Sequence, residues 1–241
     1  MRNKFLPFEI LYEDRDIIVI DKPAGLLTTN TRLIGRAARE AQPTAENFLN
    51  AYVRKGQARS SKHVSLVHRL DRETSGVMLF AKDERLADAI RDRWNELTEK
   101  TYVATVEGMI EADEGVFESY LQEDADGYRV RSVAKGGKLA RTEWRKIFLR
   151  RDRSVSPPNE GSPQRGRGTL ASSEQKTTTT VEVALKSGRK NQIRVHFSEA
   201  GHPVVGDVKY GGKKADRLYL RSVKLVFTHP FTHKRLEFAA P

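Results

Sequence analysis

Two short, unbroken apolar runs mark the first third of the chain. IIVI occupies residues 17–20, and VMLFA occupies residues 77–81 directly after Gly76. Unbroken runs of this length, bounded by turn residues, predict buried strands. The sequence KPAG at residues 22–25 follows the first run and predicts a tight turn, because proline and glycine both favour turns.

Residues 83–100, DERLADAIRDRWNELTEK, carry their large apolar groups at helical spacing. The groups on the shared face are Leu86, Ile90, Trp94 and Leu97. This pattern predicts one amphipathic helix with Asp83 as its N-terminal cap. ENFLNAYV, which begins at Glu46, predicts a second and shorter helix.

The second half of the chain alternates apolar and polar positions, as half-buried strands do. KTYVATVEGMI, YRVRSV and KLARTEWRKIFL follow this pattern, and so do residues 181–185. RLYLRSVKLVFTHPFTHKRLEFAAP, at the end, predicts two strands around a turn at His229 and Pro230. Antiparallel pairing with a few helices fits better than βαβ alternation, so we expect an α+β fold with a mixed, largely antiparallel central sheet and flanking helices.

A third helix is predicted after the turn sequence SGRKN. Asn191 can cap this helix, and Gly201 ends it. Its inward-facing residues are Ile193, Phe197 and Ala200.

Residues 150–178 break the alternation. They are rich in Ser, Pro, Gly and Arg and nearly empty of large apolar groups, so they cannot bury enough surface to offset their ordering entropy. We expect a flexible insertion between two strands, inside a single domain that spans residues 1–241.

Composition narrows the class of partner. Hydrophobic residues make up 38% of the chain and charged residues 31%, which suits a globular protein with a real core. The net charge of +11 exceeds what a fold requires and indicates a polyanionic partner, most simply nucleic acid. An anionic membrane surface would call for a basic amphipathic helix, which the sequence does not offer. Residues 1–16 lack the long apolar run of a signal peptide, and there is no cysteine, so we expect a cytoplasmic protein without disulfides.

The stretch HRLDRETSG at residues 68–76 places Asp71 between Arg69 and Arg72, at the entrance of a predicted strand. Neighbouring cations favour the ionised carboxylate, which can act as a nucleophile or a base. A charge-balanced turn explains the same residues, and a hydrolytic pair with Glu73 is a further alternative. A zinc site is not expected, because His229 and His233 flank a proline in a predicted turn and lack further ligands.

HRLDRETSGVMLFAK, at residues 68–82, closely resembles the catalytic signature of the RluA-type pseudouridine synthases. Three further segments resemble family motifs, in the family's order: EDRDIIVIDKPAGL from Glu13, EKTYVATVEG from Glu99, and LKSGRKNQIRVHFSEAGHPVVGDVKYGG from Leu185. The resemblance implies a mixed, largely antiparallel sheet crossed by an RNA cleft. It also implies isomerisation of uridine to pseudouridine within ribosomal or transfer RNA, by a monomer, without a metal or organic cofactor.

The resemblance also assigns roles to positions. Asp71 matches the catalytic carboxylate, Arg194 the arginine that pairs with it, and Tyr102 the active-site tyrosine. Leu220 matches an apolar residue beneath the target base, and Arg69 matches a residue that fills the space left when that base flips out of its stack. Arg72, Lys190 and Gln192 lie within or beside the matching motifs and are expected to contact the RNA.

Two departures from the family pattern affect RNA recognition. Arg221-Ser222 follows Leu220 where the family often has His-Ala, which changes the expected cleft wall. The stretch before the first motif is also too short for the S4-like RNA-binding module that many relatives carry. We therefore expect recognition by the catalytic domain, helped by residues 28–62.

Three functions remain open from the sequence. The leading hypothesis is an RNA pseudouridine synthase, and the second is a non-enzymatic RNA-binding or ribosome-assembly factor on the same scaffold. The trio of Asp71, Tyr102 and Arg194 favours the enzyme, because pure binding does not need it. The third is the hydrolase that uses Asp71 and Glu73, which would release free uracil or sugar.

Overall fold

The computed structural model describes residues 6–29, 42–55, 57, 60–147 and 177–241. Within these residues the strands form one sheet of eleven, in the order β1-β2-β4-β10-β5-β9-β8-β6-β7, with β11 paired to β10 and β3 paired to β4. The described strand pairs are antiparallel except β4 with β10. The expected α+β class with a mixed, largely antiparallel sheet is confirmed.

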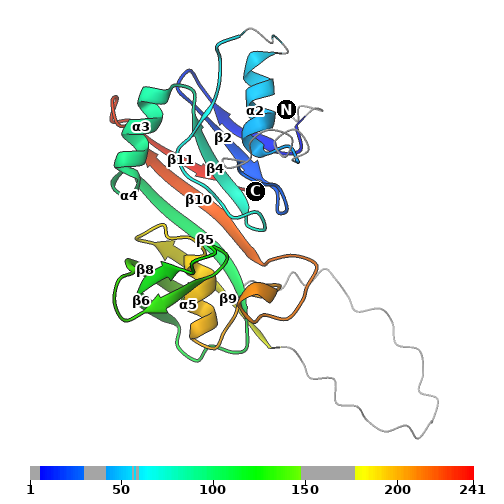
Figure 1. Ribbon diagram of the computed structural model, residues 1–241, viewed down its shortest axis with the longest axis vertical. Helices are drawn as coiled ribbons and strands as arrows, with labels where there is room; N and C mark the ends of the chain where they lie inside the picture. The colour runs from blue at the N-terminus through cyan, green and yellow to red at the C-terminus, as the bar shows by residue number, and fades with distance from the viewer. Residues whose placement is uncertain (1–5, 30–41, 56, 58–59, 148–176) are drawn as a thin grey trace, which may run out of the picture.

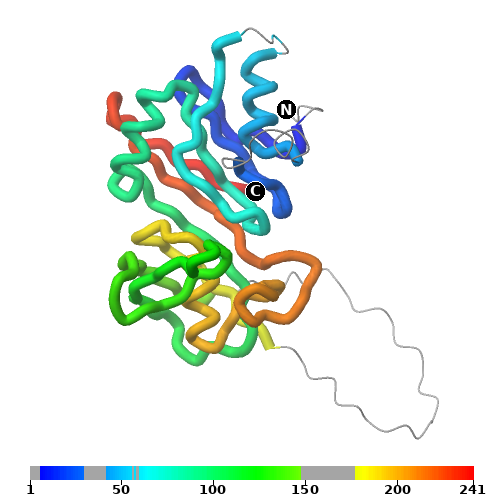
Figure 2. The backbone as a smooth tube through the Cα atoms, viewed as in Figure 1, coloured from blue at the N-terminus to red at the C-terminus, as the bar shows by residue number. Residues whose placement is uncertain are grey.

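Two lobes share this sheet (Figure 1). The upper lobe consists of β1 (Glu9–Glu13), β2 (Ile17–Lys22), α2 (Ala45–Arg54), β3 (Ser65–Leu66), β4 (Ser75–Ala81), α3 (Glu84–Asp92), α4 (Trp94–Leu97) and β11 (Arg235–Ala239). The lower lobe consists of β6 (Glu114–Glu123), β7 (Val130–Val133), β8 (Lys138–Lys146), β9 (Thr178–Leu185), α5 (Gln192–Glu199) and the 3-10 turn η1 (Val208–Tyr210). Two long strands, β5 (Thr98–Glu107) and β10 (Leu220–Thr228), run from one lobe to the other, as the tube in Figure 2 shows.

The apolar runs of β2 and β4 are unbroken because helices cover both faces of the upper sheet. Ile17, Val19, Val77 and Leu79 pack with Leu86 and Ile90 of α3 on one face. Ile18, Ile20, Met78 and Phe80 pack with Leu49 of α2 on the other. The two predicted buried strands are therefore confirmed, and so is the helix that begins near Glu46.

Gly76 lets β4 approach β10 at the point where the two strands pair. Its φ of +114° is unfavourable for a side chain, and an added Cβ would lie 1.9 Å from the Ser222 carbonyl oxygen. This parallel contact joins the strand that follows Asp71 to the strand that begins at Leu220.

The prediction of one continuous helix over residues 83–100 is wrong. Helix α3 ends at Asp92, the separate short helix α4 covers Trp94–Leu97, and Thr98 already begins β5. Trp94 stacks on His68, with ring centroids 4.3 Å apart, and also packs against the core cluster that contains Leu86 and Ile90. Local periodicity does not reveal this tertiary contact. The Asp83 cap is confirmed, because its carboxylate accepts a hydrogen bond from the Leu86 amide.

Helix α5 differs from its prediction in two details. Asn191 precedes the helix with a left-handed φ of 53° and makes no side-chain capping bond, and Ala200 is exposed. The predicted insertion falls almost entirely outside the described residues, although Thr178 already belongs to β9.

Candidate active site

The loop between β3 and β4 carries Asp71 to the junction of the two lobes. Asp71 comes directly before a tight turn at Arg72 and Glu73, and its carbonyl accepts a bond from the Thr74 amide at 3.1 Å. Its side chain keeps 26% exposure, so the carboxylate is accessible without being fully hydrated.

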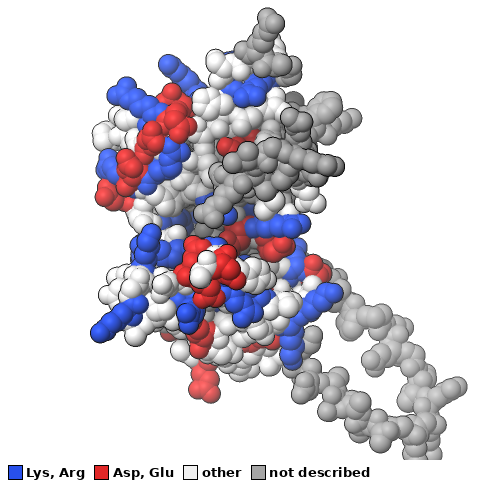
Figure 3. Space-filling view, viewed as in Figure 1, with Lys and Arg blue, Asp and Glu red and all other residues white. Residues whose placement is uncertain are grey.

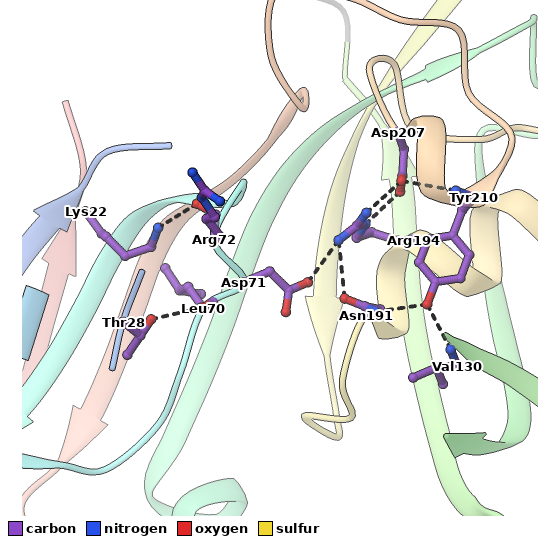
Figure 4. A network of polar contacts seen from close by, with 10 residues as sticks. All are labelled: Lys22, Thr28, Leu70, Asp71, Arg72, Val130, Asn191, Arg194, Asp207 and Tyr210. Carbon is purple, nitrogen blue, oxygen red and sulfur yellow. Dashed lines mark hydrogen bonds and ion pairs between the residues drawn. The ribbon is translucent and has the colours of Figure 1, made fainter. Parts of the chain in front are cut away.

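The first predicted turn, at residues 22–25, and Thr28 just after it clamp this loop on both sides of Asp71 (Figure 4). The Thr28 hydroxyl donates to the Leu70 carbonyl at 2.9 Å. The Gly25 amide and the Lys22 ammonium donate to the Arg72 carbonyl at 2.8 Å and 3.1 Å. Because the carbonyls on either side of Asp71 are tied down, the position of its carboxylate is fixed by the backbone.

Lys22 is fully buried and carries a second role in this clamp. Its ammonium also donates to the carbonyls of Pro23 at 3.0 Å and Leu26 at 2.8 Å. Burial lowers the pKa of Lys22 to about 8, although the negative charges of Asp71 and Glu73 oppose the shift. The sequence identified this turn, but a lysine beside a proline gave no sign that its side chain points inward.

Arg194 on α5 faces Asp71 from the lower lobe. Its guanidinium holds the Asp207 carboxylate with two bonds of 2.7 Å and reaches the Asp71 carboxylate at 3.4 Å (Figure 4). Asp207 is completely buried, and the Arg194 side chain is 9% exposed. Two-pronged pairing of this kind fixes a guanidinium in place. Asp207 lies inside the third motif, but the sequence assigned it no role.

Arg194 stays charged in this buried setting. Desolvation opposes its charge, but the hydrogen bonds and negative charge of Asp207, together with Asp71, raise the pKa of Arg194. The Asn191 side-chain carbonyl also accepts from Arg194 at 3.3 Å, while its amide group donates to the Tyr210 hydroxyl at 2.9 Å. The left-handed residue before α5 therefore supports the arginine rather than capping the helix.

A cavity of about 210 Å³ lies at this junction. It is lined by Asp71, Tyr102, Arg194, Leu220, Arg69, Lys190 and Gln192, among others. Tyr102 extends from β5 opposite Ser222 of β10. Burial and the negative charge of Asp71 raise the pKa of Tyr102 to about 12, against a smaller opposing effect of Ser222, so its phenol is neutral near pH 7.

The remaining expected residues lie in different surroundings. Leu220 is buried in the cavity wall, and Arg69 is exposed at its edge. Lys190 also lines the cavity and donates to the Glu123 carboxylate at 2.7 Å. Arg72 lines a neighbouring cavity together with Glu73, and these two side chains pair at 3.6 Å. Glu73 does not line the cavity that holds Tyr102 and Leu220, but it lines the neighbouring cavity together with Asp71.

Gln192 is engaged by the protein itself. Its amide nitrogen donates to the Arg141 carbonyl and the Thr142 hydroxyl, and its carbonyl accepts from the Ser187 hydroxyl and the Arg189 amide. Both donors and both lone pairs are thereby used, which favours a structural role over the expected contact with RNA.

The arrangement presents an accessible anion, a buried cation behind it, and a neutral phenol in one cavity. An ionised carboxylate so placed can attack an electron-poor carbon or remove a proton, and the phenol can donate a proton or stack on a flat ring. The described residues hold no group of three or more His, Cys, Asp or Glu that suits a metal ion. No helix in the described ranges is long and apolar enough to cross a membrane.

Comparison with known proteins identifies the class to which this fold and site belong. The RNA pseudouridylate synthase family model matches residues 16–199, so the chain belongs to the pseudouridine synthases, and its named relatives place it among the RluA-type enzymes. YhcT of Bacillus subtilis, an uncharacterized RNA pseudouridine synthase, is 32% identical over 97% of this chain and 68% of its own length.

Two named relatives extend the comparison. The dual-specificity RNA pseudouridine synthase RluA of Vibrio vulnificus is 32% identical over 93% of this chain and 79% of its own. The tRNA pseudouridine synthase C of Vibrio parahaemolyticus is 30% identical over 96% of this chain and 89% of its own. Among solved structures, human RNA pseudouridylate synthase domain containing 4 has the same fold, with a TM-score of 0.68 at 20% identity over 96% of this chain and 87% of its own.

Proposed function

We propose that this RNA pseudouridine synthase isomerises specific uridines in ribosomal or transfer RNA, with Asp71 as the catalytic carboxylate. The observation that carries the proposal is the Asp71 carboxylate in a cavity, 3.4 Å from the buried guanidinium of Arg194. Transfer RNA is included as a substrate because one relative is named tRNA pseudouridine synthase C.

The reaction rearranges one nucleotide without gain or loss of atoms. The C1′–N1 bond breaks, the uracil rotates, and a C1′–C5 bond forms, while one proton leaves C5 and one joins N1. The Asp71 oxygen starts this sequence by attacking C1′, by attacking C6, or by removing a ribose proton. Each route needs an ionised oxygen, and the Arg194 guanidinium lies 3.4 Å from the carboxylate that would supply it.

Tyr102 and Leu220 hold the base in this proposal. The phenol ring can stack on the uracil, and because its pKa is raised to about 12, it donates a hydrogen bond rather than acting as a base at neutral pH. Leu220 supplies a flat apolar surface below the base. These contacts favour a planar ring over a flexible ligand.

A uridine in structured RNA reaches this cavity only after it leaves its stack, which costs a few kcal/mol. Arg69 is exposed at the cavity edge, where its planar guanidinium can enter the vacated space and donate hydrogen bonds. Lys190, at the cavity mouth, can contact a phosphate. The charge of +11 strengthens association with RNA in general.

Pseudouridine mapping of total RNA tests this function. We expect a strain without the gene to lose pseudouridine at one or a few positions in ribosomal or transfer RNA, and the wild-type gene to restore them. An unchanged map in the deletion strain would contradict the proposal. Free uracil released on incubation of the enzyme with RNA would indicate hydrolysis instead.

A further inference from the structure

A second cavity of about 430 Å³ adjoins the Asp71 cavity. The two cavities share Asp71, Lys190, Asn191 and Arg194. The far side of the second cavity is formed by Tyr128, from the turn between β6 and β7, and by η1. A strand of RNA whose target nucleotide lies over Asp71 can therefore place the adjacent nucleotide in this second cavity.

Tyr128 offers a large exposed ring at a fixed place. Its residue is 62% exposed, although it lies at the end of an ordered turn. The Tyr128 amide donates to the Asp126 carboxylate at 2.8 Å, and the Gly127 amide donates to the Asp124 carbonyl at 2.8 Å. These bonds order the backbone of the turn, and the exposed ring that the turn carries is a surface on which a base can stack.

Lys209 of η1 joins this ring to the active site. Its ammonium lies 4.5 Å from the centre of the Tyr128 ring and 5.5 Å from that of Tyr210, and the Arg194 guanidinium lies 5.1 Å from the same Tyr210 ring. Rings and cations therefore alternate from the exposed Tyr128, through Lys209 and Tyr210, to Arg194, which pairs with Asp71. Figure 4 shows the inner end of this series, where Tyr210 lies beside Arg194.

The charges around the second cavity favour a base over a long run of phosphates. The β6–β7 turn is acidic, and Figure 3 shows red side chains gathered at the junction of the lobes with blue ones on either side. The carboxylates of Glu123 and Asp124 are paired with Lys190 and Arg131. Lys209 instead faces two neutral rings, so its charge is available to one phosphate.

We propose that Tyr128 and Lys209 form a binding site for the nucleotide adjacent to the target uridine. The Tyr128 ring stacks on the base of that nucleotide, and the Lys209 ammonium contacts its phosphate. The inference rests on the proposed function, because that function places the uridine over Asp71.

A binding cycle tests the stacking contact without relying on catalysis. The probe is a nine-nucleotide RNA with one central uridine between adenines, together with two versions that lack the base immediately before or after the uridine. Fluorescence anisotropy gives the Kd of each RNA for the wild-type protein and for Tyr128→Ala. We expect Tyr128→Ala to weaken the complete RNA about tenfold. One of the two abasic RNAs should bind both proteins equally.

Matched variants separate stacking from general effects. Tyr128→Phe keeps the ring and should bind like wild type, and so should Tyr120→Ala, which removes an exposed tyrosine from the outer face of β6. Lys209→Gln should reduce the slope of log Kd against log salt concentration by about 0.7, the value for one phosphate contact on a single strand. Lys224→Gln, which removes a lysine paired with Glu237, should leave the slope unchanged.

Equal loss on all three RNAs, or no loss on the complete RNA, would overturn the inference. The outcome is separate from that of the proposed function. If the enzyme forms pseudouridine but Tyr128→Ala weakens the complete and the abasic RNAs equally, the inference alone fails. If one abasic RNA escapes the loss as expected and no pseudouridine forms in any RNA, the nucleotide site stands and the proposed reaction fails.

Discussion

The two walls of the active-site cavity are held by different kinds of interaction. On the Asp71 wall, hydroxyl, amide and ammonium donors fix the backbone carbonyls of Leu70 and Arg72. The side chain of Asp71 itself stays 26% exposed. On the Arg194 wall, the side chain itself is fixed, by two 2.7 Å bonds that it donates to the buried Asp207 carboxylate.

The contact between the walls is much longer than the contacts within them. Arg194 lies 3.4 Å from Asp71, against 2.7 Å from Asp207. The arginine is therefore held by Asp207 on its own wall and makes only one longer contact with Asp71 across the cavity. We infer that this arrangement leaves the Asp71 oxygens free to react, because Arg194 does not hold them in a two-pronged pair.

Among changes outside Asp71 itself, removal of the Arg194 cation should have the largest effect, because it alters both walls. We expect Arg194→Gln to lower kcat/KM on the order of a thousandfold and the free energy of unfolding by about 3–5 kcal/mol, because the buried Asp207 carboxylate loses its cationic partner. Steady-state isomerisation and thermal unfolding measure the two effects. Arg194→Lys keeps the charge but loses the planar fork and should fall in between. Wild-type activity in Arg194→Gln would contradict the role of the cation.

Neutralising the anchor should affect the Arg194 wall alone. We expect Asp207→Asn to lower kcat about tenfold or more, with RNA affinity within about twofold of wild type, because Arg194 loses its fixed position but keeps its charge. The free energy of unfolding should fall by about 1.5–3 kcal/mol, as for buried hydrogen bonds to charged groups.

Glu99→Gln is the matched control for this change. It neutralises an exposed carboxylate that pairs with Arg235 at 3.1 Å, and such surface pairs contribute at most about 1 kcal/mol. An unchanged kcat in Asp207→Asn would show that the buried pair serves stability alone.

Lys22 gives the Asp71 wall a pH dependence. Its pKa is lowered from 10.5 to about 8, so the ammonium discharges as pH rises from 7 to 9, and the Arg72 carbonyl then loses its charged donor. We expect activity to fall several-fold with a midpoint near pH 8. Lys22→Met, which carries no charge at any pH, should be about tenfold less active at pH 7. Its activity should not show the further fall near pH 8.

The same shift acts on stability with the opposite sign. Between pH 8 and 10.5 the unfolded chain binds more protons at Lys22, so the contribution of this residue to the free energy of unfolding rises with pH. Lys100→Met is the control, because burial also lowers the pKa of Lys100 to about 8 but its ammonium lies beside Trp94 and Asn95. Loss of the fall in activity near pH 8 in Lys100→Met, rather than in Lys22→Met, would reject the assignment.

The smallest expected effect comes from a single neutral hydrogen bond. Thr28→Val keeps the side-chain shape but removes the donor to the Leu70 carbonyl, which costs about 1–2 kcal/mol of unfolding free energy. Activity should fall two- to fivefold, as measured by steady-state isomerisation. Thr105→Val, which removes a partly buried hydroxyl on β5 that faces Thr180, is expected to leave activity unchanged. A larger activity loss in Thr105→Val than in Thr28→Val would contradict the clamp.

Patterns within one segment predicted most of the fold. Apolar runs and alternation predict the strands β2, β4, β5, β7, β8, β9, β10 and β11. The helix break after Asp92 does not follow, since the apolar spacing continues unbroken through Trp94 and Leu97.

Site residues could be predicted only where a local charge pattern or a motif marks them in the sequence. An aspartate between two arginines attracts notice, and the motif resemblance supplied Tyr102 and Arg194. The anchor Asp207 and the buried Lys22 were missed, because their roles arise from contacts between segments 13 and 50 positions apart. Gln192 was expected to bind RNA because it lies in a motif, yet its hydrogen bonds are all used within the fold.

The most direct test of the central claim is the pseudouridine yield of purified Asp71→Asn on an RNA that the wild-type enzyme modifies. Asparagine keeps the size of the side chain and removes the anion that Arg194 supports. We predict no detectable product, with RNA affinity within about twofold of wild type. Product at the wild-type rate would contradict the assignment of Asp71 and the account built on it.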